Sequence, residues 1–239
     1  MVKYYDKAVR GTEAEDLKVI IQFFDGMIGQ TFSFLNYYKE IPVSYDAVLL
    51  GVEDGMAEFE VHAYQAKVIN IERRALIYSH ELSQVSEDII GEAFYVNSVK
   101  KRVILCRFAY ARIRSVMRRF VRVALAHPVE ADLIFDGDIL KGNIQDISLS
   151  GASVDTISKD LLEPGLDINL FIKLPDFVRD NVIEVGMSAS IVRVLGDSPP
   201  FKCIMEFHPE KHSQQQIAYY INQRQVQIIK ELKDIDAPN

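Results

Sequence analysis

The strongest constraint on the fold is the strict alternation of apolar and polar residues along short segments in the second half of the chain. Apolar residues occupy every second position of 183–191, and the same pattern recurs in 129–135 and 168–174. A period of two places one face in a core and the other in solvent, which is typical of antiparallel strands. Asp136 and Gly137 are suited to a tight hairpin turn. These features predict a small β-barrel.

A capping box is recognisable near the start of the chain. Thr12 is expected to be the N-cap residue, with Glu15 reaching back to it. Apolar residues at helical spacing follow as far as Ile28. The pattern predicts one amphipathic helix over roughly 13–28, ended by Gly29.

The residues after this helix are rich in β-branched and aromatic side chains, in short runs separated by turns such as Glu53–Gly55. Such runs predict strands and therefore an amino-terminal β-domain. The predicted strands are 31–35, 45–51, 56–62, 66–71, 74–79, 93–99 and 101–108.

A closing helix is predicted from Ser213. Its apolar stripe comprises Ile217, Ile221, Ile228, Ile229 and Leu232. A chain of 239 residues is long enough for two small domains. We therefore expect a mainly β fold of two small β-barrel domains, in which 1–111 carries the leading helix and 112–239 is closed by the carboxy-terminal helix.

Charge is distributed unevenly along the chain. The net charge is −7, yet nine basic residues and no acidic residue lie between Lys100 and Arg122. Self-repulsion makes such a segment costly unless a negative partner binds it. The segment also joins the two predicted domains, so the junction is a candidate site for an anionic ligand.

Two motifs follow one another at this junction. The first comprises Arg114, Arg118, Arg119 and Arg122, and the second is Asp146-Ile-Ser148-Leu-Ser150-Gly151. An RxxxR motif followed by DxSxxG on the next hairpin resembles the signature of PilZ-domain receptors for cyclic di-GMP. The resemblance covers about 115–233. The amino-terminal domain is similar, more loosely, to the split-barrel-like domain that precedes PilZ in proteins of the flagellar-brake type.

The resemblance implies that Arg118 and Arg122 bind phosphate and guanine, while Asp146 and Ser148 recognise guanine by hydrogen bonds. Arg114 and Arg119 are additional candidates. Independent of the family, a guanidinium can bind phosphate oxygens in bidentate fashion, contact guanine O6 and N7, or stack on a base. A carboxylate suits the guanine N1–H and amine donors.

Gly151 is expected to have a backbone role. Glycine would allow a positive φ in this turn and a close approach of the backbone to the ligand.

The resemblance further implies a signalling protein that couples cyclic di-GMP binding to domain rearrangement and to a protein partner in flagellar motility, biofilm, secretion or polysaccharide machinery.

Simpler explanations remain open for both motifs. Arg114, Arg118 and Arg122 could form one solvated helix face, and Asp146 and Ser148 could merely cap a turn. The chain could also be a ligand-independent PilZ-like scaffold or adaptor. A third possibility is binding of single-stranded nucleic acid. The negative net charge disfavours it, so no DNA partner is expected.

Other classes of function are not supported. The sequence contains no GxSxG, HExxH, P-loop or Rossmann motif, so we expect no enzyme activity. Cys106 and Cys203 have no metal-ligand spacing, so no metal or cofactor is expected beyond the ligand, and both thiols are expected to be reduced and buried. No apolar run approaches the ~20 residues of a membrane span, and the start lacks a signal-like apolar region. We expect a cytoplasmic protein.

Overall fold

The computed structural model describes residues 4–78, 88–113 and 120–235. These residues divide into two compact units. The amino-terminal unit contains the described residues up to 113, except 39–41, together with 232–235. The carboxy-terminal unit contains 39–41 and 120–231. The mainly β fold class with two barrels is confirmed, while the predicted domain boundary at 111/112 stays a prediction.

The amino-terminal unit is a closed ring of six strands with a seventh added at one edge. In the ring the order is β7-β4-β3-β2-β5-β6, closed by pairing of β6 with β7, and β1 pairs with β7 outside it. The strands are β1 (Tyr5–Ala8), β2 (Thr31–Tyr38), β3 (Ile41–Glu53), β4 (Met56–Glu60), β5 (Arg74–Tyr78), β6 (Asp88–Asn97) and β7 (Arg102–Ile113).

The leading helix α1 (Glu13–Asp25) begins as its capping box predicts. Thr12 accepts a hydrogen bond from the amide of Glu15, and the Glu15 carboxylate accepts one from the amide of Thr12. The helix ends earlier than expected, because Gly26 is its C-cap. Gly29 has a φ of +85° and belongs to the following turn.

The strand predicted over 66–71 was wrong, because this segment lies within helix α2 (Ala63–Glu72). The helix buries Gln65, Ala66, Val68 and Ile69, which share one face at helical spacing. A short run containing three β-branched residues does not by itself distinguish a strand from a buried helix. In this segment, contacts with the barrel favour the helix.

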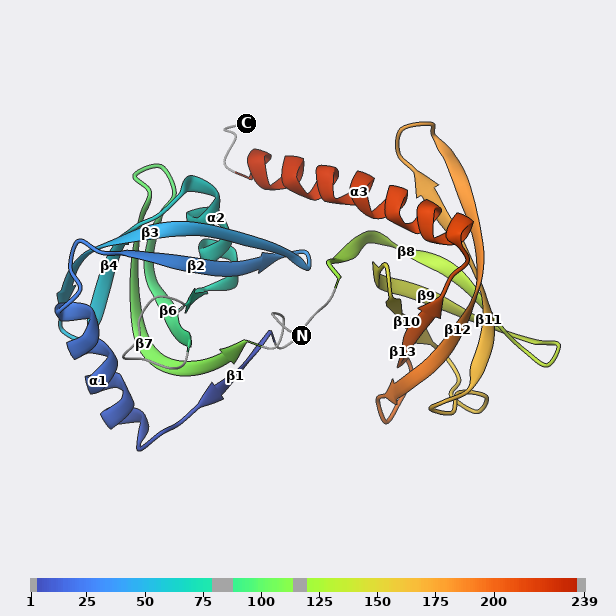
Figure 1. Ribbon diagram of the computed structural model, residues 1–239, viewed down its shortest axis with the longest axis horizontal. Helices are drawn as coiled ribbons and strands as arrows, with labels where there is room; N and C mark the ends of the chain where they lie inside the picture. The colour runs from blue at the N-terminus through green and yellow to red at the C-terminus, as the bar shows by residue number, and fades with distance from the viewer. Residues whose placement is uncertain (1–3, 79–87, 114–119, 236–239) are drawn as a thin grey trace. The chain divides into compact units, whose positions relative to one another are not determined.

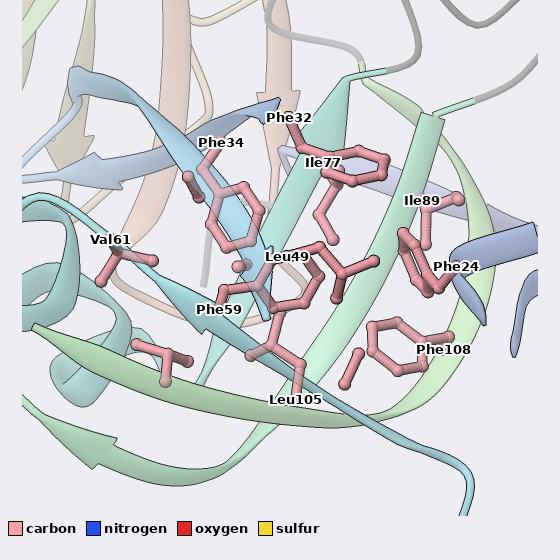
Figure 2. Packing of buried hydrophobic residues seen from close by; sticks show 14 of the residues in the cluster. Phe24, Phe32, Phe34, Leu49, Phe59, Val61, Ile77, Ile89, Leu105 and Phe108 are labelled. Atoms are coloured by element: carbon pink, nitrogen blue, oxygen red, sulfur yellow. The ribbon is translucent and has the colours of Figure 1, made fainter. Parts of the chain in front are cut away.

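Aromatic residues form the centre of the amino-terminal core (Figure 2). Phe24 of α1 is fully buried, and its ring contacts those of Phe32, Phe59 and Phe108 at edge-on angles, with centroids 5.1–5.8 Å apart. Edge-to-face packing is favourable for such rings. The leading helix therefore supplies one of the central side chains of this core.

The carboxy-terminal unit is a closed six-stranded barrel of order β10-β13-β12-β11-β8-β9, with helix α3 against it (Figure 1). The elements are β8 (Arg122–Phe135), β9 (Asp138–Ser148), β10 (Gly151–Thr156), β11 (Asp167–Asp176), β12 (Asn181–Leu195), β13 (Phe201–His208) and α3 (Lys211–Asp234). The alternation in β11 is confirmed, since Ile168, Leu170, Ile172 and Leu174 are buried. Asp136 and Gly137 make the expected turn, both with positive φ.

Helix α3 differs from expectation at its start and on its stripe. It begins two residues before Ser213, whose hydroxyl donates to the carbonyl of Gly186 at 2.8 Å. Ile229 is 46% exposed, while Arg224 is buried on the stripe beside Ile217 and Ile228. None of the helices in the described part of the chain is long and apolar enough to cross a membrane.

Candidate functional site

Strand pairing in the carboxy-terminal barrel brings the motif residues together. Arg122 begins β8 and pairs with Ser148, the last residue of β9. Ser148 also pairs with Gly151, the first residue of β10. The start of β8, the end of β9 and the start of β10 therefore meet, and Asp146 lies two residues before the end of β9.

The Arg122 and Asp146 side chains meet across the β8–β9 pair. Val123 and Ile147, which pair with one another, are fully buried, so their neighbours Arg122 and Asp146 face outward. The distance from Arg122 Nη1 to Asp146 Oδ1 is 3.5 Å, with the side chains 31% and 13% exposed. An ion pair this long and partly solvated contributes about 1 kcal/mol or less. It orients both groups without locking them.

Asp146 is also held from the other side. Its second carboxylate oxygen accepts a hydrogen bond from Ser153 of β10, which pairs with Asp146 in the β9–β10 register and is 1% exposed. Ser153 is not among the site residues that the sequence motifs predict. Its contact with Asp146 depends on the length of the hairpin between the two residues. The spacing of the motif residues alone therefore gives no indication of this contact.

Ser148 caps the turn in this structure. It is 1% exposed, its hydroxyl donates to the carbonyl of Gly151 at 3.1 Å, and it accepts from the amide of Ser150 at 3.4 Å. The turn-capping alternative therefore describes this side chain. Contact of Ser148 with a ligand stays a prediction.

The positive φ expected for Gly151 was wrong, while a close approach of its backbone to the ligand stays a prediction. Gly151 is not among the glycines with positive φ. It belongs to β10 and pairs with Glu206 of β13, where a Cβ atom would lie 2.1 Å from the carbonyl oxygen of Met205. Glycine is therefore required for the close approach of two strands, not for a left-handed turn.

Three of the predicted site residues cannot be placed. Arg114, Arg118 and Arg119 lie outside the described residues, so the structure neither brings them to Arg122 nor separates them from it. Among the residues that the structure does describe, no group of His, Cys, Asp or Glu could hold a metal ion.

The two cysteines differ in burial. Cys203 is fully buried, and burial raises the pKa of its thiol to about 11. Cys106 is only partly buried, contrary to expectation, although burial also raises the pKa of its thiol. At neutral pH both remain mostly protonated and are poor nucleophiles.

Comparison with known proteins finds one matching family model. The PilZ domain model matches residues 117–223. No curated protein matches this chain. Similar solved structures include Escherichia coli YcgR in complex with c-di-GMP, at 10% identity and TM-score 0.43, covering 97% of each chain.

Two further structures have comparable similarity. Bacillus subtilis MotI/DgrA, an inhibitor of motility, is 14% identical with TM-score 0.43, covering 84% of this chain and 97% of its own. The K. pneumonia MrkH–c-di-GMP complex is 14% identical with TM-score 0.42, covering 95% and 100%. The match to the family model establishes that this chain contains a PilZ domain in residues 117–223.

Proposed function

We propose that this protein is a receptor for cyclic di-GMP whose binding site includes Arg122 and Asp146. The observation that carries the proposal is that these two residues come from separate strands of the PilZ barrel yet lie 3.5 Å apart on its outer face. They combine a planar cationic donor with an anionic acceptor. Cyclic di-GMP offers partners for both, because its phosphates and guanine O6 and N7 accept while guanine N1–H and the N2 amine donate.

Binding would exchange one set of contacts for another. The Arg122 guanidinium would leave its long contact with Asp146 for a phosphate or for the Hoogsteen edge of guanine. Asp146 would then accept from the N1–H and amine edge, while Ser153 keeps one of its oxygens in place. The ligand replaces a weak ion pair by several charge-assisted hydrogen bonds, which are the stronger kind.

The remaining arginines extend this site in the proposal. Arg118 would be the second clamp residue, with Arg114 and Arg119 as further contacts to phosphate. The basic segment 100–122 favours a doubly charged ligand, which would neutralise part of its self-repulsion. We infer that this neutralisation rearranges the amino-terminal domain and so regulates a protein partner in motility, biofilm, secretion or polysaccharide production, in the cytoplasm.

Isothermal titration calorimetry of the full chain with cyclic di-GMP tests the proposal. Wild type should bind, while Arg118→Ala and Asp146→Ala should bind much more weakly. Matched controls are Arg193→Ala, an exposed arginine of β12, and Asp132→Ala, whose carboxylate lies 3.6 Å from Lys141 on β8–β9. Both controls should bind like wild type.

Each outcome discriminates between explanations. Absence of binding by wild type would refute the receptor and favour a ligand-independent adaptor. Binding that both site variants leave unchanged would refute the residue assignment. Salt-dependent binding to a single-stranded oligonucleotide without any response to cyclic di-GMP would favour a nucleic-acid protein.

A further inference from the structure

The part of β8 that carries Arg122 is paired over a short stretch. Residues 122–124 pair with β9, and the register then shifts between Ala124 and Val129. The pairing of β8 with β11 runs over Ala131–Ile134, beyond this shift. The first three residues of β8 are therefore separated by an irregularity from the part of the strand that has neighbours on both sides.

Arg224 of α3 contacts this short stretch from outside the sheet. Its Nε donates to the carbonyl oxygen of Ala124 at 3.1 Å, two residues along the strand from Arg122. Its Nη1 donates to Glu231 Oε1 at 2.9 Å and to Gln227 Oε1 at 3.1 Å. The guanidinium is thus oriented by its own helix at one end and holds the β8 backbone at the other.

The burial of Arg224 is costly. It is 1% exposed, and its Nη2 atom has no hydrogen-bond partner in the described structure. An unsatisfied buried donor costs about 1–3 kcal/mol, and more when the group is charged. Arg224 also lies on the apolar stripe of α3, where a hydrophobic residue would fit the pattern. An apolar side chain could fill the space but could not bind the Ala124 carbonyl.

We propose that Arg224 is a positioning residue for the cyclic di-GMP site: its hydrogen bond to Ala124 holds the first residues of β8 so that Arg122 is oriented before the ligand arrives. This inference rests on the function proposed above. Ordering the arginine in advance removes part of the entropic cost of binding. Ala124 pairs directly with Asp146, so the same hydrogen bond also supports the backbone opposite the acceptor.

Two variants separate the hydrogen bond from the charge. Arg224→Met removes both, and Arg224→Lys retains a cation for Glu231 but cannot span both partners. We expect both variants to bind cyclic di-GMP about five- to tenfold more weakly, the equivalent of one ordinary hydrogen bond, because the effect reaches the ligand only through Arg122. The midpoint of thermal unfolding should change little, because the loss of the hydrogen bond to the Ala124 carbonyl is offset by the removal of a buried unpaired donor. Lys230→Met, an exposed residue of the same helix, is the control and should bind normally.

Hydrogen–deuterium exchange tests the contact without ligand. In Arg224→Lys, backbone amides of 122–126 should exchange faster, while those of the β11–β12 pair should be unchanged. If Arg224→Met does not fold, Arg224→Lys carries the test. Faster exchange throughout the barrel, with a large fall in thermal stability, would overturn the proposal and make Arg224 a general stabilising residue.

A double-mutant cycle with Arg122→Lys distinguishes a positioning role of Arg224 from a purely structural role. If Arg224 acts through Arg122, the affinity loss caused by Arg224→Lys should largely disappear in the Arg122→Lys background. Fully additive losses, or unchanged affinity in both Arg224 variants, would overturn the inference while wild-type binding still supports the receptor. Failure of wild type to bind would instead refute the receptor itself, and the inference with it.

Discussion

Arg122 and Asp146 lie diagonally across the β8–β9 pair, with Arg122 opposite Ser148 and Asp146 opposite Ala124, and their charged atoms are 3.5 Å apart. Diagonal neighbours in a sheet are within reach of a long side chain, so the arginine bridges the gap. The contact joins the two motifs in space. It also means that a ligand must compete with a contact worth about 1 kcal/mol or less, which is a small barrier.

Asp146→Asn should separate binding from stability. The amide keeps the shape of the side chain but loses its charge and one acceptor position, so affinity for cyclic di-GMP should fall about ten- to a hundredfold, as for a lost hydrogen bond to a charged group. The midpoint of thermal unfolding should fall only slightly, because the ion pair with Arg122 is weak. Calorimetry and thermal unfolding measure the two effects. A large loss of stability with normal affinity would contradict this prediction.

Ser153→Ala should weaken binding through Asp146. Removal of the buried hydroxyl frees one carboxylate oxygen and should reduce affinity about fivefold, the equivalent of one neutral hydrogen bond. Ser190→Ala is a matched control, because Ser190 donates to Asp167 elsewhere on the same barrel. Equal affinity of the two variants, measured by calorimetry, would show that Ser153 does not orient the acceptor.

Gly151→Ala should destabilise the barrel. The added methyl would lie 2.1 Å from the backbone oxygen of Met205, so β10 and β13 must separate locally. We expect a loss of about 1–3 kcal/mol, as for other overpacked sites. Gly51→Ala is the control, since a Cβ at Gly51 meets nothing within 4 Å. Chemical denaturation measures both, and equal stability of the two variants would refute the close-approach explanation.

Acid should weaken the attachment of α3 through Asp176. Burial opposes ionisation of Asp176, but hydrogen bonds from Gln223 and from the amides of Val178 and Arg179 outweigh it and lower the pKa of its carboxyl group. A lowered pKa in the folded state contributes stability above the unfolded pKa, about 3.9. That stability is lost as the pH falls through the lower, folded pKa.

Asp176→Asn gives the comparison for this pH effect. The variant should be less stable than wild type at pH 6, and the difference should shrink as the pH falls below about 4, where wild type begins to lose the same contribution. Urea unfolding at a series of pH values measures it. A difference that stays constant over the whole range would contradict the role of this carboxylate.

The sequence could predict features that depend on neighbouring residues. Thr12 and Glu15 form their capping box, and Asp136 and Gly137 adopt the positive φ of a tight turn, because each depends on a few adjacent residues. Helix α2 could not be predicted in this way. Its short apolar run fits either a strand or a helix, and the barrel that covers one of its faces determined which one formed.

The same distinction between local and long-range features applies to the candidate site. Residue spacing and alternation are local properties, so the sequence alone could indicate Arg122, Asp146 and Ser148 as candidate site residues and predict the mainly β fold. Three further features became apparent only in the folded structure: the close approach of Gly151 to β13, the hydrogen bond from Ser153 to Asp146, and the contact of Arg224 with the strand of Arg122 about a hundred residues away. These contacts join segments distant in sequence, and their geometry exists only once the strands have paired and α3 has packed against the barrel.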